Sequence, residues 1–151
     1  KDAVIIMAGA AGMHPDSKKF WSSALPKIKN YIDIANIHHI TGPDGRCDKE
    51  MWVDEFAKLL KNKNINKPIW VTEAMTGKCN AIDTYVNAFL SGAEIIVDVG
   101  INAPGPKMSV ENRNQLNKFI EKFNNFKSIK KLSANEVEFE LDNGSLLKYQ
   151  Y

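Results

Sequence analysis

Four short apolar segments alternate with four amphipathic segments along residues 1–126, and this alternation constrains the fold more than any other feature. The apolar segments are rich in isoleucine and valine, which is typical of strands buried in a sheet. The segments between them repeat apolar side chains at helical spacing. The order βαβαβαβα predicts a parallel sheet with crossover helices. The expected strands start near residues 4, 32, 68 and 94, and the expected helices span residues 20–30, 51–61, 80–90 and 111–126.

The last part of the sequence has a different pattern. Residues 137–151 alternate apolar and polar side chains on either side of an Asn-Gly pair, which is typical of a tight hairpin turn. Residues 129–132 are a candidate for one more strand. We therefore expect two regions: a βα region over residues 1–126, and a small C-terminal β extension over residues 127–151 that packs on it.

Composition excludes several classes of protein. The chain is 44% hydrophobic and 25% charged, like an ordinary globular domain. A formal charge of +2 gives no reason to expect a nucleic-acid partner or a membrane surface. No apolar run approaches the roughly 18 residues that a membrane span needs. Because the sequence begins at Lys1 and enters a strand-like segment at Val4, we expect it to be cut from a longer protein. The cellular compartment stays open.

Polar side chains follow the predicted strands at the point where each strand ends. Asn36 and His38 close the second strand, Glu73 closes the third and Asp98 closes the fourth. The carboxyl ends of parallel strands meet at one edge of a sheet, where binding and catalytic groups collect. These four residues are therefore the candidate site.

Glu73 is the strongest candidate for a functional residue among them. The two-residue period of a strand puts it on the face of Ile69 and Val71, which we expect to be the inner layer, and opposite Trp70, which we expect to pack on a helix. A lone carboxylate at a strand end also fits an ordinary loop or cap ligand. His38 fits either a partner that orients Glu73 or a histidine bonded within the loops.

Other patterns carry less chemistry. The alternation that turns His38 inward turns His39 the other way. The histidines and carboxylates show no HExxH or comparable ligand spacing, so we expect no metal and no cofactor. The segment Gly9-Ala10-Ala11-Gly12 matches no phosphate-binding motif and is predicted to be an ordinary loop.

Residues 67–73, Lys-Pro-Ile-Trp-Val-Thr-Glu, resemble the seventh strand of the clan A retaining glycoside hydrolases, a TIM-barrel superfamily. Residues 31–38 resemble the sixth strand, residues 4–12 the fifth with its glycine-rich end, and residues 93–100 fall where the eighth belongs. The resemblance implies an α/β fold: the C-terminal half of a (β/α)8 barrel, with four βα units and a C-terminal β-hairpin extension. The residues alone leave a four-stranded open sheet equally open.

The resemblance also implies a function. It implies part of a glycoside hydrolase that cleaves O-glycosidic bonds of an oligo- or polysaccharide by a retaining double displacement. Glu73 would be the nucleophile, and Asn36, His38 and Asp98 would line the sugar site. In these families the acid/base is a glutamate at the end of the fourth strand, which would lie in an N-terminal half outside this sequence.

A partner is expected on the same grounds. An isolated half barrel would leave two sheet edges and an apolar layer open to water. We therefore expect a carbohydrate substrate together with either an N-terminal half-barrel chain or a second copy of this chain, and no activity without that half.

Two other functions stay open. One is a non-catalytic carbohydrate-binding or scaffold barrel, favoured by the absent acid/base strand and by Val97-Asp98-Val99, where many members carry an aromatic residue. The other is a different TIM-barrel enzyme, such as a lyase or a metal-dependent hydrolase that uses His38, Glu73 and Asp98.

Overall fold

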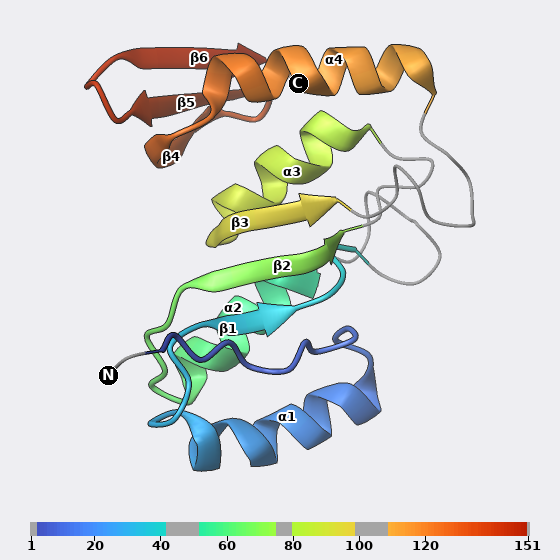
Figure 1. Ribbon diagram of the computed structural model, residues 1–151, viewed down its shortest axis with the longest axis vertical. Helices are drawn as coiled ribbons and strands as arrows, with labels where there is room; N and C mark the ends of the chain where they lie inside the picture. Colours follow the sequence, from blue (N-terminus) through green and yellow to red (C-terminus); the bar gives the residue numbers. More distant parts are fainter. Residues whose placement is uncertain (1–2, 42–51, 75–79, 99–108, 151) are drawn as a thin grey trace.

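The computed structural model describes residues 3–41, 52–74, 80–98 and 109–150, which form a mixed α/β arrangement with two small sheets (Figure 1). The first sheet is parallel, in the order β1-β2-β3, and the second is antiparallel, in the order β4-β5-β6. The parallel strands are β1 (Ala35–Ile37), β2 (Ile69–Ala74) and β3 (Ala93–Asp98). The antiparallel strands are β4 (Phe126–Ser133), β5 (Glu136–Leu141) and β6 (Leu146–Gln150).

Four helices accompany these strands in the described ranges, and two of them make the crossovers of the parallel sheet. They are α1 (Pro15–Ile28), α2 (Trp52–Asn62), α3 (Ala81–Leu90) and α4 (Val110–Phe123). The predicted alternation of helices and parallel strands is confirmed for β1 to β3. The first helix begins at Pro15 rather than at residue 20. Proline is well suited to the first helical turn, because an N–H there has no partner within the helix and its absence costs no hydrogen bond. Of the predicted segment 93–100, residues 99 and 100 lie outside the described residues.

The first predicted strand is only partly formed. Its segment makes two parallel bridges to β1 and its flank, Ile6 to Ile34 and Ala10 to Ile37. Residues 4–6 are nevertheless between 42 and 69% exposed. The prediction of a strand buried on both faces is therefore wrong here, because in the part of the chain that the structure describes nothing packs closely over these side chains.

One face of the parallel sheet packs on helices. Ala35, Ile69 and Ala93 are in register across the three strands, and all three side chains are buried. They belong to one hydrophobic core with Val53 and Phe56 of α2. Burial of these apolar side chains is the main force that holds the crossover helices on the sheet.

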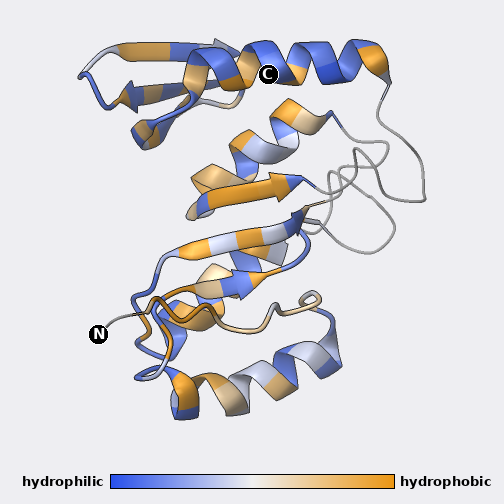
Figure 2. Ribbon diagram, in the orientation of Figure 1, coloured by the Kyte–Doolittle hydropathy of each residue, from blue (hydrophilic) through white to orange (hydrophobic). Residues whose placement is uncertain are grey.

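The opposite face of the sheet is exposed at β3. Asn36, Trp70 and Ile95 form the next register row. One step from Ile69 to Trp70 matches two steps from Ala93 to Ile95, so an extra residue in β3 keeps Ile95 on the face away from the helices. The prediction that Trp70 packs on a helix is therefore wrong, since Ile69 occupies that side. Ile95 and Val97 of β3 are 40 and 46% exposed, and the β3 ribbon is strongly apolar (Figure 2).

The antiparallel sheet has its own aromatic core. Phe139 of β5 is fully buried, and its ring centroid lies 4.7 Å from that of Phe123, 5.2 Å from that of Phe126 and 6.0 Å from that of Phe119. Val86 of α3 belongs to the same cluster. The predicted hairpin is confirmed, and the candidate strand at residues 129–132 is part of β4.

Tyr149 ties this sheet to α3. Its hydroxyl donates a hydrogen bond to the Asp83 carboxylate over 3.2 Å. Its ring stacks edge-on against Phe119 and Phe123. Burial, aided by Asp83, raises the pKa of the Tyr149 hydroxyl to about 12, so the donor proton is retained across the neutral range.

Tyr149→Phe tests this link between β6 and α3. The ring contacts remain but the hydrogen bond is lost, so we expect the free energy of unfolding to fall by about 1 kcal/mol. Urea denaturation measures the change. Tyr31→Phe removes a hydroxyl from an exposed side chain and should change nothing. Equal stabilities of the two variants would contradict the prediction.

Candidate functional site

A β-bulge changes the direction of the side chains at the end of β2. Val71 pairs with Ile96 and Ala74 pairs with Asp98, so three steps along β2 match two steps along β3. The extra residue reverses the alternation beyond Val71. Ala74 is fully buried, although strict alternation would place it on the open face. Glu73 lies inside the bulge and therefore does not share the helix-facing side of Ile69 and Val71.

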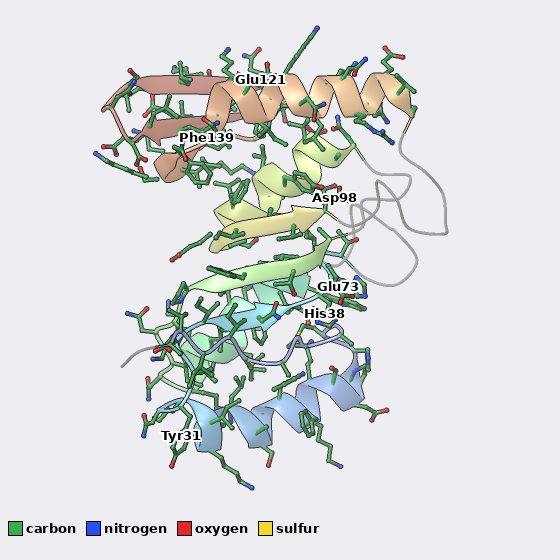
Figure 3. The ribbon with its side chains drawn as sticks, viewed as in Figure 1. Tyr31, His38, Glu73, Asp98, Glu121 and Phe139 are labelled. Atoms are coloured by element: carbon green, nitrogen blue, oxygen red, sulfur yellow. The ribbon has the colours of Figure 1, made fainter. Side chains whose placement is uncertain are left out.

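Glu73 reaches the same side of the sheet edge as His38. Its side chain is 53% exposed, and its Oε2 lies 3.5 Å from Nδ1 of His38 (Figure 3). His38 is the neighbour that the sequence indicated for it. The prediction that Glu73 shares a face with Ile69 and Val71 is wrong, because those two side chains are buried on the helix side and the bulge intervenes.

Asn36 fixes the strands beneath this pair. It is buried, its Nδ2 donates to the Met7 carbonyl over 3.3 Å, and its Oδ1 accepts from the Thr72 hydroxyl over 2.9 Å. Its amide therefore joins the N-terminal segment, β1 and β2 immediately below Glu73. A buried amide with both ends bonded holds its neighbours in one arrangement. Contact between Asn36 and a sugar stays a prediction.

A second histidine, missed by the sequence reasoning, also contacts Glu73. His39 makes a hydrogen bond with the Glu73 backbone, and its ring centroid lies 6.3 Å from that of Trp52 at the start of α2. Its ring is nearly perpendicular to that of His38, at 6.4 Å. His14 also faces the Trp52 ring at 6.3 Å. The three histidines of the chain thus gather around Trp52 and Glu73.

The pH dependence of stability tests the environment of His39. Burial, together with His38, lowers the pKa of the His39 imidazole, against the opposing effect of Glu73. The unfolded chain, with a histidine pKa of about 6.5, then binds the proton more readily than the folded one. Stability from His39 is therefore complete above about pH 6.5 and is lost as the pH falls through the lowered pKa.

His39→Gln should remove this part of the acid-side loss of stability. Urea unfolding of both proteins between about pH 8 and pH 5 measures it, since a histidine titrates in that window. The same dependence on pH in both proteins would show that His39 is not the group responsible.

Asp98 lies at the same edge but faces α3. Its carboxylate accepts a hydrogen bond from the hydroxyl of Tyr85. Burial and this carboxylate raise the pKa of Tyr85 far above its usual value. The structure thus brings Asn36, His38 and Glu73 together and places Asp98 on the neighbouring strand, turned toward a helix. A contact of Asp98 with a sugar stays a prediction.

Two features were not found in the described ranges. They contain no group of three or more His, Cys, Asp or Glu side chains that could hold a metal ion. Among these residues no helix is both long enough and apolar enough to cross a membrane. A hollow of about 470 Å³ lies at the other end of the sheet, beside Lys67, Ile69 and Gly92, where β2 and β3 begin. It is separated from Glu73 by the length of β2.

Comparison with protein-family models, with curated proteins and with solved structures finds no match for this chain. The fold class stands on the strand order and the register described above. The site stands on the contacts of Glu73.

Proposed function

We propose that this chain is the nucleophile-bearing part of a glycoside hydrolase that cleaves O-glycosidic bonds of an oligo- or polysaccharide with retention of configuration. The observation that carries the proposal is the half-exposed Glu73 carboxylate, which a bulge turns toward His38 at the carboxyl end of a parallel sheet. The resemblance of residues 67–73 to the seventh strand of clan A glycoside hydrolases supports the same role.

The chemistry assigns each group a task. One oxygen of Glu73 attacks the anomeric carbon, the glycosidic C–O bond breaks, and the leaving oxygen takes a proton from a carboxylic acid. Water, deprotonated by the resulting carboxylate, then attacks the same carbon and releases Glu73. With its Nδ1 at 3.5 Å, His38 orients one carboxylate oxygen and leaves the other for attack.

The acid must come from elsewhere. A retaining mechanism needs two carboxyl groups about 5 Å apart. Of the carboxylates described on the parallel strands, Asp98 faces Tyr85, and Glu94 lies at the amino end of β3, far along the strand from Glu73. We place the acid/base in the N-terminal half of a (β/α)8 barrel, of which these strands would form the C-terminal half.

The open face supports such a complement. Exposed apolar side chains lie at both edges of the parallel sheet. Residues 4–6 lie beside β1 at one edge, and Ile95 and Val97 lie on β3 at the other. Parallel sheets are rarely left uncovered in water. A half barrel with four more strands, either a separate chain or a second copy, would cover this face and the two edges.

The mass of the intact native particle tests the complement. Native mass spectrometry, followed by denaturing mass spectrometry, should show these residues together with a second half-barrel. A stable native particle of 16.9 kDa, the mass of this chain alone, would contradict the proposal.

The stereochemistry of the first product tests the reaction. The native protein is incubated with a panel of aryl α- and β-glycosides, and the anomer released first is identified by NMR. Retention of configuration supports a double displacement, whereas inversion would overturn it.

A non-catalytic carbohydrate-binding or scaffold barrel is the second candidate. The hydrogen bond from Tyr85 to Asp98 favours it, because it engages a carboxylate that was expected to meet the sugar. Calorimetric binding of an oligosaccharide without hydrolysis would select this function.

A further inference from the structure

We infer that Gly9 is a positioning residue, whose missing side chain seats the His38 imidazole against Glu73. A Cβ atom built on Gly9 would lie 1.6 Å from Nε2 and 1.8 Å from Cδ2 of His38. Those distances are far shorter than any contact between non-bonded atoms. The imidazole therefore lies directly on the Gly9 backbone, with its other nitrogen toward Glu73.

The backbone conformation does not explain this glycine. Gly92 and Gly144 have φ angles of +101° and +82°, in the region that disfavours side chains, and a Cβ on either would meet nothing within 4 Å. Gly9 is the reverse case, since its φ lies outside that region and its Cβ position is filled by a ring. The requirement for glycine at position 9 thus comes from His38.

Backbone hydrogen bonds hold the two segments together at this contact. The Ala10 N–H donates to the Asn36 carbonyl over 3.0 Å, and the His38 N–H donates to the Ala10 carbonyl over 2.9 Å. Ala10, the residue after Gly9, is thus bonded to β1 at Asn36 and to His38 itself. A methyl group at position 9 must therefore displace the ring, and the ring then leaves Glu73.

The role of Gly9 in catalysis rests on the proposed function, but the seating of His38 does not. Its test has two readouts. The first is the ¹⁵N chemical shift of His38 Nδ1, recorded with glutamate and with glutamine at position 73. The shift should respond to Glu73→Gln when position 9 is glycine, and should not respond in the Gly9→Ala protein.

The second readout is a double-mutant cycle on hydrolysis in the native protein. Gly9→Ala alone should lower kcat about tenfold or more, because small misplacements of groups near the reacting atoms are costly. In the His38→Ala background the same change should cost nothing, because no ring is left to displace.

Gly12→Ala is the matched control. A Cβ on Gly12 would lie 2.1 Å from the Trp52 ring, and its three nearest atoms belong to that ring rather than to His38. The inference is overturned if Gly12→Ala also abolishes the response of the Nδ1 shift, or if Gly9→Ala costs as much without the imidazole as with it.

Two further outcomes keep the test decisive. If Gly9→Ala does not fold, the Gly9→Ala/His38→Ala protein should fold, and failure of that rescue would overturn the inference. If the chemical-shift response behaves as expected while Glu73→Gln leaves hydrolysis unchanged, the proposed function fails and the seating of His38 stands.

Discussion

Glu73→Gln is expected to lower the rate of glycoside hydrolysis by the native protein by a factor of about 10³ or more, as loss of a covalent nucleophile does. Glutamine preserves the shape of the side chain, the bulge and the nearby His38. It removes the charged oxygen that attacks the anomeric carbon. The measurement is kcat/KM with an activated aryl glycoside that the wild-type protein hydrolyses.

Glu94→Gln is the matched control for this prediction. Glu94 is an exposed carboxylate on β3 of the same sheet, near its amino end rather than at the edge that carries Glu73. Glu94→Gln removes one negative charge by the same substitution. We expect its kcat/KM to stay within about twofold of the wild-type value, as for a surface change far from the site. A Glu73→Gln protein that retained more than about a tenth of the wild-type rate would exclude Glu73 as the nucleophile.

Phe139→Ala is expected to lower the free energy of unfolding by about 3–5 kcal/mol, the usual cost of emptying a buried aromatic site. Phe139 is fully buried and contacts the rings of Phe119, Phe123 and Phe126. The cavity would open where β5, β4 and α4 meet. Such a loss is a fifth or more of the stability of a typical domain, which is about 5–15 kcal/mol.

Urea denaturation, followed by circular dichroism, measures this loss. Leu146→Ala provides the comparison, because Leu146 is an exposed residue of β6 in the same sheet and should cost no more than about 0.5 kcal/mol. A loss below about 1 kcal/mol for Phe139→Ala would show that the aromatic cluster does not hold the antiparallel sheet together.

The order of the elements could be predicted because it depends on local patterns. Apolar runs followed by helical spacing identified β1 to β3 and their crossovers, and an Asn-Gly pair between alternating segments identified the β5-β6 hairpin. Residues 4–6 were misjudged for a different reason. Their composition is that of a buried strand, but burial also needs a neighbour on each side, which no local pattern reports.

The site was predicted in part. Strand ends pointed to Asn36, His38 and Glu73, and the structure brings these three together. The sequence gives no sign of the bulge that turns Glu73, because a bulge is a mismatch between the lengths of two paired strands.

Gly9 and His39 were missed for a related reason. Their importance lies in contacts with residues distant in the sequence, His38 and Glu73 respectively. A glycine beside the end of a predicted strand was the available signal for the close approach of another group.

Covalent trapping tests the central claim, that Glu73 is a glycosidase nucleophile, most directly. The native protein is incubated with a panel of 2-deoxy-2-fluoroglycosyl fluorides, in which the fluorine at C2 slows hydrolysis of the glycosyl-enzyme so that it accumulates. The protein is then digested and analysed by mass spectrometry. A glycosyl group on Glu73 is the predicted result. Hydrolysis of glycosides with the label on another carboxylate, or with Glu73 never labelled, would contradict the account.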